Sequence, residues 1–204
     1  MFLLLLLLLA AGIWGWTSKP WEQWEFFTGD AENTVIIDRY DRVLDEYVSL
    51  NSYTALRQMN TQYPMQTKML IEDVLELGYV DEPNVEQRLR SFYLDSTVQI
   101  ILDEVHRQYG DMSDIEEAFE EAFERQREKD PNFRTPHVYT LISCLHQSIV
   151  VTDTLIGISL DKYLGEDFPL YNKYYTREQR AQMNRNAIVG DAIQAYLHYT
   201  KNEP

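Results

Sequence analysis

The sequence predicts an α+β fold that is mostly α-helical, with helices packed on a small antiparallel sheet at about residues 138–160. Apolar residues recur at helical spacing through much of the first 130 positions, which is typical of amphipathic helices. Further on, the pattern changes to short runs rich in β-branched and aromatic residues, which favour strands. Pro131 and Pro136 separate the two regions, because proline cannot continue a helix.

Three helices are expected before the acidic part of the chain. Their apolar positions lie within residues 36–47, 65–75 and 89–105. The second helix ends at Gly78, a residue suited to the left-handed conformation that terminates many helices. The third ends at Tyr109 and Gly110.

A fourth helix begins near Ser113. Ser113 and Glu116 have the spacing of a capping box, in which each side chain accepts a hydrogen bond from a backbone N–H of the first turn. The opposite face of this helix is acidic and carries Glu117, Glu120, Glu121 and Glu124. Because Arg125 and Arg127 interrupt the acidic run, we interpret it as a solvated face rather than a cation site.

Three strands are expected at residues 138–142, 148–152 and 155–160, joined by short turns. Two further helices are expected at residues 177–183 and 188–199.

The first residues predict export or membrane attachment. Residues 1–16 are expected to be a signal peptide or an N-terminal membrane anchor, residues 17–33 a linker, and residues 34–200 a single domain. Gly12 stands where a lipoprotein signal would have its acylated cysteine, so lipidation at this position is excluded. We favour a retained anchor, because four tryptophans follow closely and indole rings favour the membrane interface. Cleavage after Ala11 is the alternative.

Composition excludes several classes of function. The chain has 18 Lys and Arg against 33 Asp and Glu, a net charge of -15, which repels nucleic acid and anionic lipid. The single cysteine, Cys144, excludes an internal disulfide. A small buried thiol is the simplest interpretation of Cys144. The alternative is a nucleophile with His146, two residues on, as its base.

The sequence contains no familiar catalytic or metal-binding motif. None of the histidines, His106, His137, His146 and His198, begins a His-Glu-x-x-His pair. Gly-x-Ser-x-Gly elbows and glycine-rich phosphate loops are also missing. Asp161, Glu166 and Asp167 supply too few oxygens for a convincing calcium loop. We therefore predict no catalytic residue, no metal site and no cofactor.

Several motifs carry a resemblance to a known family. They are Val138-Tyr139-Thr140-Leu141-Ile142-Ser143, Ser148-Ile149-Val150-Val151, Leu155-Ile156-Gly157-Ile158, Leu160-Asp161-x-Tyr163-Leu164-Gly165-x-Asp167 and Pro169-Leu170-Tyr171, with Arg39-Tyr40-Asp41-Arg42-x-Leu44-x-Glu46-Tyr47 upstream. Over residues 36–197 the chain resembles the GldB-related family of envelope proteins of Bacteroidota, named for a gliding-motility lipoprotein. It is similar to the short form of that family, which lacks a further C-terminal region.

The resemblance implies a cell-envelope protein that faces the periplasm, with unidentified envelope proteins as partners and with the membrane contacted through the N-terminal segment. The family has been compared in fold with zinc metallopeptidases, but no catalytic residue carries over to this sequence. The loop of the signature gives a candidate interaction surface, formed by Asp161, Tyr163, Asp167, Tyr171, Tyr174 and Tyr175. Aromatic clusters mark interfaces, but half-buried packing is an equal alternative here.

Two functions remain open at this point. The favoured one is a non-catalytic binding or scaffold component of an envelope or gliding-type machinery. The alternative is a degenerate or cryptic metal-dependent hydrolase, similar to a zinc metallopeptidase, that uses His146 or His198 with acidic neighbours.

Overall fold

The computed structural model describes residues 34–202. By its internal contacts the chain divides between Thr34 and Val35, and the described helices and strands lie in the unit Val35–Pro204. The predicted anchor at residues 1–16 and the predicted linker at residues 17–33 lie outside the described residues.

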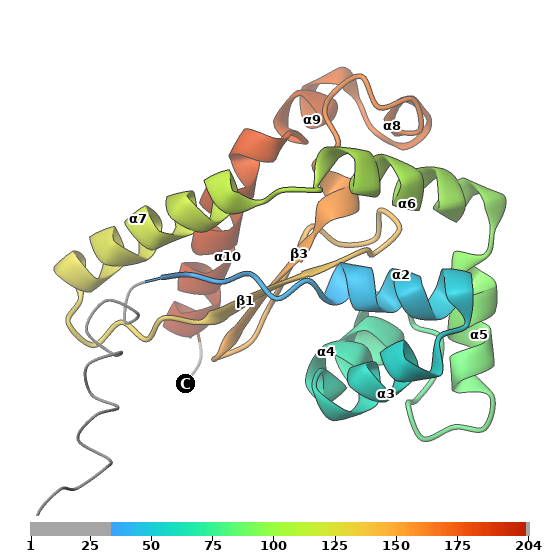
Figure 1. Cartoon of the computed structure of the whole chain (residues 1–204). Coiled ribbons are helices and arrows are strands. Elements are labelled where there is room, and N and C mark those ends of the chain that lie inside the picture. The colour runs from blue at the N-terminus through green and yellow to red at the C-terminus, as the bar shows by residue number, and fades with distance from the viewer. Residues whose placement is uncertain (1–33, 203–204) are drawn as a thin grey trace, which may run out of the picture. The chain divides into compact units, whose positions relative to one another are not determined.

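The elements follow one another as Figure 1 shows. They are α2 (Tyr40–Leu50), α3 (Tyr53–Thr61), α4 (Pro64–Lys68), the π-helical η3 (Met69–Val74), α5 (Val85–Tyr93), α6 (Ser96–Gln108), α7 (Ser113–Lys129), β1 (His137–Leu141), β2 (Ile149–Val151), β3 (Leu155–Ser159), the 3-10 turn η4 (Leu160–Lys162), α8 (Tyr171–Tyr174), α9 (Arg177–Gln182), the 3-10 turn η5 (Arg185–Ala187) and α10 (Ile188–Asn202). Within residues 34–202, no helix is both long enough and apolar enough to cross a membrane.

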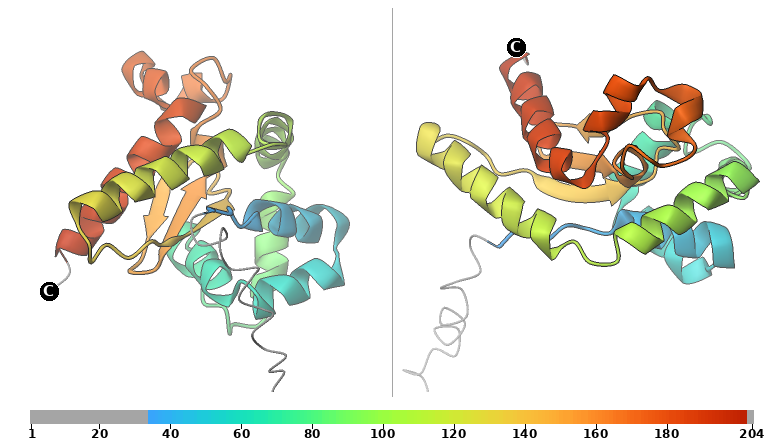
Figure 2. Two further views of the ribbon diagram at one scale, coloured as in Figure 1. Left: turned by 60° about the vertical axis from the view of Figure 1, so that its left-hand side comes forward. Right: turned by 90° about the horizontal axis from the view of Figure 1, so that it is seen from above.

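The three predicted strands are present, and the mostly helical α+β fold class is confirmed. The strand order is β1-β3-β2, and Figure 2 shows the strands between α10 on one side and α2 on the other. The prediction of an antiparallel sheet is wrong in part. Strand β2 is antiparallel to β3, with Val150 opposite Gly157, but β1 is parallel to β3, with Val138 opposite Ile156. The chain reverses twice between β1 and β3, so these two strands run in the same direction when they pair.

The first predicted helix begins four residues later than its apolar pattern indicated. Asp38 pairs with β1 instead: its N–H donates to the carbonyl of Val138 at 3.0 Å, and its carbonyl accepts from the N–H of Thr140 at 2.9 Å. Ile36, which the helical pattern included, is 75% exposed. The pairing with β1 therefore overrides the helical periodicity at this end.

The third predicted helix is two helices, α5 and α6. Asp95 separates them, because its carboxylate caps α6 by accepting from the N–H of Thr97 at 2.8 Å. Gly78 has the expected positive φ of 122°, but the preceding helix already ends before it, and Glu76 is also left-handed at φ 51°.

The predicted capping box at Ser113 is absent. Ser113 is the first residue of α7, and its N–H and hydroxyl both donate to the carboxylate of Asp111, at 3.0 and 3.1 Å. Glu116 accepts instead from the N–H of Ile37 at 3.0 Å. Glu120, which was expected on a solvated face, accepts from the N–H of Val35 at 2.9 Å. Two carboxylates of α7 therefore bind the extended segment before α2, whose N–H groups need acceptors.

A partly buried ion pair stabilises the start of α2. Arg39 binds Asp41 through two hydrogen bonds, of 2.8 and 2.7 Å, and also donates to the carbonyl of Tyr109 at 2.8 Å. The hydroxyl of Thr140 donates to the same Asp41 carboxylate, which is only 1% exposed. This network joins α2 to β1 and to the end of α6.

Gly157 lets β3 approach β1 and its tyrosine closely. A Cβ atom at this position would lie 2.5 Å from both Cζ and Oη of Tyr139 and 2.9 Å from a methyl carbon of Leu141. The ring of Tyr139 is itself 2% exposed and packs edge-on against Tyr40 of α2. The ring therefore lies over the glycine and cannot move without disturbing the core.

We predict that Gly157→Ala lowers the free energy of unfolding by about 1–3 kcal/mol, because the added methyl group overpacks this contact. Gly190→Ala is the matched control, since no atom lies within 4 Å of the added Cβ and the residue is in a helix. The control is expected to leave stability unchanged or raise it by up to about 1 kcal/mol. Denaturant unfolding of both variants measures the difference, and equal effects would show that the close approach of β3 to Tyr139 is unimportant.

Candidate functional site

The predicted interaction surface does not exist as one surface. Asp161, Tyr163 and Tyr171 are 0%, 2% and 0% exposed, so they cannot meet a partner directly. Their placement inside the protein corrects that part of the prediction.

The three buried residues hold the loop after β3 from within. The hydroxyl of Tyr171 donates to the carbonyl of Asp161 at 2.6 Å and accepts from the N–H of Leu164 at 3.0 Å. The carbonyl of Tyr163 accepts from the hydroxyl of Tyr109, also at 2.6 Å. Polar backbone groups in a buried loop need such partners, and tyrosine supplies them together with an apolar ring.

The other three members of the predicted surface lie in two different places. Asp167 is exposed and lines a hollow beside α6, together with Phe168 and Pro169. Tyr174 is 53% exposed, and Tyr175 is half-buried. These two tyrosines line one pocket, which is formed around the turn that follows β1.

This turn, at residues 143–147, has an unusual backbone. Cys144 and Leu145 both have positive φ, at 53° and 71°, which costs non-glycine residues of order 1–3 kcal/mol each. The carboxylate of Asp161 holds the turn in place. It accepts from the N–H of Ser143 at 2.9 Å and from the N–H of Leu145 at 2.5 Å.

Burial raises the pKa of Asp161, while its hydrogen bonds from the N–H groups of Leu145 and Ser143 act in the opposite direction. Burial also raises the pKa of the Cys144 thiol, and the nearby carboxylates of Asp161 and Asp95 add to this effect. The thiol is therefore neutral at physiological pH, which argues against the alternative of a nucleophilic cysteine.

His146 is exposed at the surface of the same turn. Its Nδ1 lies 2.7 Å from the carbonyl oxygen of Ser143. Because a carbonyl oxygen only accepts, Nδ1 carries a proton in this contact and donates. The contact orients the imidazole along the turn and does not direct it to act as a base for Cys144.

Tyr175 joins the turn to the segment after α8. Its hydroxyl donates to the carbonyl of Leu145 at 2.9 Å, and the ammonium of Lys162 lies 2.8 Å from the same hydroxyl oxygen. The wall that Tyr175 contributes to the pocket is thus bonded to the adjacent wall, which the turn forms.

The pocket beside the turn has a volume of about 460 Å³ and a mainly apolar lining. Its lining residues are Phe92, Thr97, Val98, Ile101, Cys144, Leu145, His146, Tyr174 and Tyr175. The four that come from α5 and α6 were not predicted as site residues. Their spacing in the sequence indicates only an amphipathic helix, and nothing in it shows that residues 144–146 and 174–175 lie opposite.

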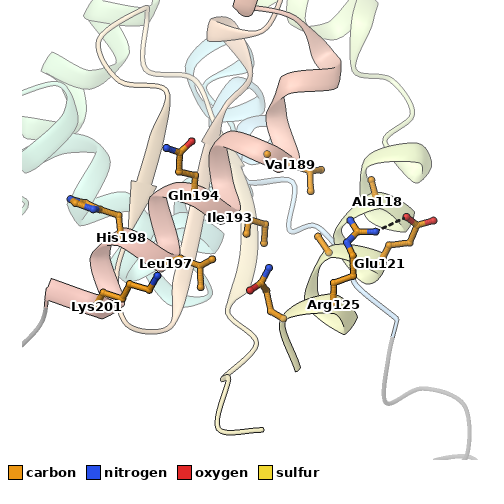
Figure 3. Close-up of a pocket in the computed structure, with 12 residues that line it drawn as sticks. Ala118, Glu121, Arg125, Val189, Ile193, Gln194, Leu197, His198 and Lys201 are labelled. Atoms are coloured by element: carbon orange, nitrogen blue, oxygen red, sulfur yellow. Dashed lines mark hydrogen bonds and ion pairs between the residues drawn. The ribbon is translucent and has the colours of Figure 1, made fainter. Parts of the chain in front are cut away.

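A second hollow lies between α7 and α10, as Figure 3 shows, with a volume of about 670 Å³. Val189, Ile193 and Leu197 of α10 face Ala118 of α7 across it, and Glu121 and Arg125 form an exposed ion pair at 3.2 Å on its rim. His198 projects from the side of α10 that lies away from α7. The two histidines of the hydrolase hypothesis, His146 and His198, therefore line different pockets.

Among residues 34–202, no group of three or more His, Cys, Asp or Glu side chains is placed to hold a metal ion. The carboxylate of Asp161, which lies nearest to the turn, has its oxygens bonded to backbone N–H groups. The arrangement therefore offers an apolar hollow beside a turn that hydrogen bonds from Asp161 hold in place.

We predict that the contribution of Asp161 to stability decreases as pH rises. Because its pKa is raised in the folded protein, this contribution is full below the ordinary pKa of aspartic acid, about 4, and is lost as pH rises through the folded value. Asp161→Asn should destabilise the protein by about 1–3 kcal/mol, since an amide leaves one buried N–H without an acceptor. The difference between wild type and variant should be larger near pH 4 than near pH 8.

Asp167→Asn is the matched control, because this exposed carboxylate lies in the same loop. Its difference from wild type should be small at every pH. If the effect of Asp161→Asn instead grew with pH, the carboxylate would have a lowered pKa and our view of its burial would be wrong.

We predict that the Cys144 thiol is unreactive in the folded protein. Because its pKa is raised, alkylation by iodoacetamide at pH 8 should be at least about tenfold slower than in urea, where the thiol regains an ordinary pKa. Intact-mass measurement reports the extent of labelling without ambiguity, since the chain has a single cysteine. Equal rates in the two states would indicate an accessible, activated thiol.

Comparison with known proteins identifies the family. The comparisons with curated proteins and with solved structures found no match. A family model described as gliding motility protein GldB matches residues 23–204, a range that includes all of the described elements and the signature motifs around β1, β3 and the loop after them. This chain therefore belongs to the GldB family of gliding motility proteins.

Proposed function

We propose that this protein is a non-catalytic binding component of an envelope assembly of the gliding-motility type. Membership of the GldB family supports an envelope component, and the pocket beside the 143–147 turn supports a binding role. The observation that carries the proposal is the strained turn, which the buried Asp161 maintains as one wall of that pocket. A costly backbone conformation that the surrounding structure maintains is often part of a functional site.

The proposed ligand of the pocket is an apolar side chain of a partner protein in the envelope. The lining is mainly apolar, and an aromatic residue at the rim, Tyr174, is about half exposed. Tyrosine and apolar pockets are typical of the centres of protein interfaces. The net charge of -15 disfavours nucleic acid and anionic lipid as alternatives.

The proposed location is the periplasmic side of a membrane. Residues 1–16 would serve as an anchor or a cleaved signal, residues 17–33 as a linker, and residues 34–200 as the binding domain. Gly12 prevents acylation at the position that a lipoprotein would use, so attachment would depend on the leucine run itself.

The alternative of a cryptic metal-dependent hydrolase gains no support from residues 34–202. His146 and His198 line separate pockets, and no described cluster of ligands accompanies either of them.

Thr97→Trp tests the proposed role of the pocket. Thr97 is exposed at the pocket and is the second residue of α6, so an indole ring can fill the opening without disturbing the Asp95 cap, which uses the backbone N–H. We expect the variant to fold normally. In envelopes of its own host, the amount of partner recovered by crosslinking should fall at least about tenfold, which is equivalent to about 1.4 kcal/mol of binding.

Thr54→Trp is the matched control, because Thr54 is the exposed second residue of α3 and lies away from this pocket. It should retain the crosslinked partner and restore the phenotype of a deletion strain as wild type does. The proposal would be overturned if both variants behaved alike, or if the purified protein hydrolysed peptides at a rate that metal chelation abolished.

A further inference from the structure

The sheet has one open edge, formed by β2. Strand β1 lies at the other edge, and there the backbone of Asp38 pairs with it through the two hydrogen bonds described above. Strand β2 has β3 on one side and no strand among the described residues on the other.

The register of β2 determines which backbone groups point outward. The N–H of Ser159 donates to the carbonyl of Ser148 at 2.9 Å, and the N–H of Thr152 donates to the carbonyl of Leu155 at 3.0 Å. In an antiparallel pair, bonded residues alternate with residues that face away, so Ile149 and Val151 direct their backbone groups to the open edge.

These outward groups are largely unpaired within residues 34–202. Gln147 donates its side-chain amide to the carbonyl of Ile149 at 3.0 Å, which closes one of the four positions. No described residue accepts from the N–H of Ile149 or of Val151, and none donates to the carbonyl of Val151. Both residues are half-buried.

We propose that this edge binds an extended segment of a partner polypeptide, which adds to the sheet as a fourth strand beside β2. Two N–H groups and a carbonyl on alternate residues match the backbone of another strand, whereas an anion or a single side chain would satisfy only part of the set. The β-branched side chains of Ile149 and Val151 suit cross-strand packing against such a segment.

A second copy of this chain is a poorer occupant. An edge of three residues buries too little surface for a stable dimer, and two chains of charge -15 repel each other. The brevity of β2 also limits uncontrolled pairing, as is usual for edge strands. Gln147 adds to this protection, and because it is exposed, it can leave the carbonyl of Ile149 when a partner strand arrives.

Binding at this edge is separate from the proposed function of the pocket, because it uses the backbone groups of β2 and does not depend on the apolar lining. The two are close in the chain, since β2 begins two residues after the 143–147 turn. No residue of β2 lines the pocket, so each feature can be removed without the other.

Val151→Pro tests the edge in the full-length protein. Proline removes an N–H that points outward and leaves the bonds between Val150 and Gly157 intact, so an edge strand tolerates it. Val151→Thr is the control that keeps both the N–H and a β-branched side chain. The probe is a displayed library of random nonapeptides, selected on wild-type protein.

We expect the selected peptides to slow amide exchange at Ile149 and Val151. They should bind Val151→Pro at least about tenfold more weakly than wild type, a loss equivalent to about 1.4 kcal/mol, and bind Val151→Thr normally. Thr97→Trp should bind the peptides as wild type does. The proposal for the pocket and the proposal for the edge can therefore fail independently.

N-methylation of the peptide provides a second test, which does not require the proline variant to fold. A methyl group on alternate peptide residues should abolish binding, and a methyl group on the intervening residues should not. The proposal is overturned if no peptide is selected, if Val151→Pro binds equally well, or if the edge proves to be filled by a second copy in a concentration-dependent dimer.

Discussion

The carboxylate of Asp161 is the interaction on which the candidate site depends. It lies just after β3 and accepts hydrogen bonds from the N–H groups of Ser143 and Leu145, which follow β1. Because β1 and β3 are parallel neighbours, their carboxyl ends meet at the same end of the sheet, and one side chain can bind both. Two consecutive residues in the left-handed region would otherwise relax, and the wall that they give to the pocket would be lost.

Tyrosine hydroxyl groups stabilise the backbone that follows β1 and β3. Tyr171 donates to the carbonyl of Asp161, Tyr109 to that of Tyr163, and Tyr93 to that of Ile142. Each of these carbonyls lies beyond the end of a strand, where no neighbouring strand provides a donor. A tyrosine satisfies such a group and fills the core with its ring, which explains why buried tyrosines gather at this end of the sheet.

The hydrogen bonds around the 143–147 turn also bear on the proposed function. Several side chains of the loop that carries the family signature are buried, and those of Asp161 and Tyr171 form hydrogen bonds inside the protein. Burial raises the pKa of the Cys144 thiol and keeps it neutral, and His146 is hydrogen-bonded to the Ser143 carbonyl. In the binding role that we propose, a surface held by such hydrogen bonds would lose little conformational entropy when a partner arrives.

The sequence by itself determined the fold class, the three strands within about one residue, and helices α9 and α10 but not the short α8, because each predicted element has a strong local periodicity. It also carried the family signature. Only the tertiary structure decided the direction in which β1 pairs, the extended course at Asp38, and the acceptor role of Glu116 and Glu120. The same is true of Asp161, Tyr163 and Tyr171, whose polar atoms suggested a surface but are bonded internally. The physical reason is that periodicity records the type of an element and which of its faces is buried, whereas pairing direction and the burial of polar groups depend on which distant backbone groups need a partner.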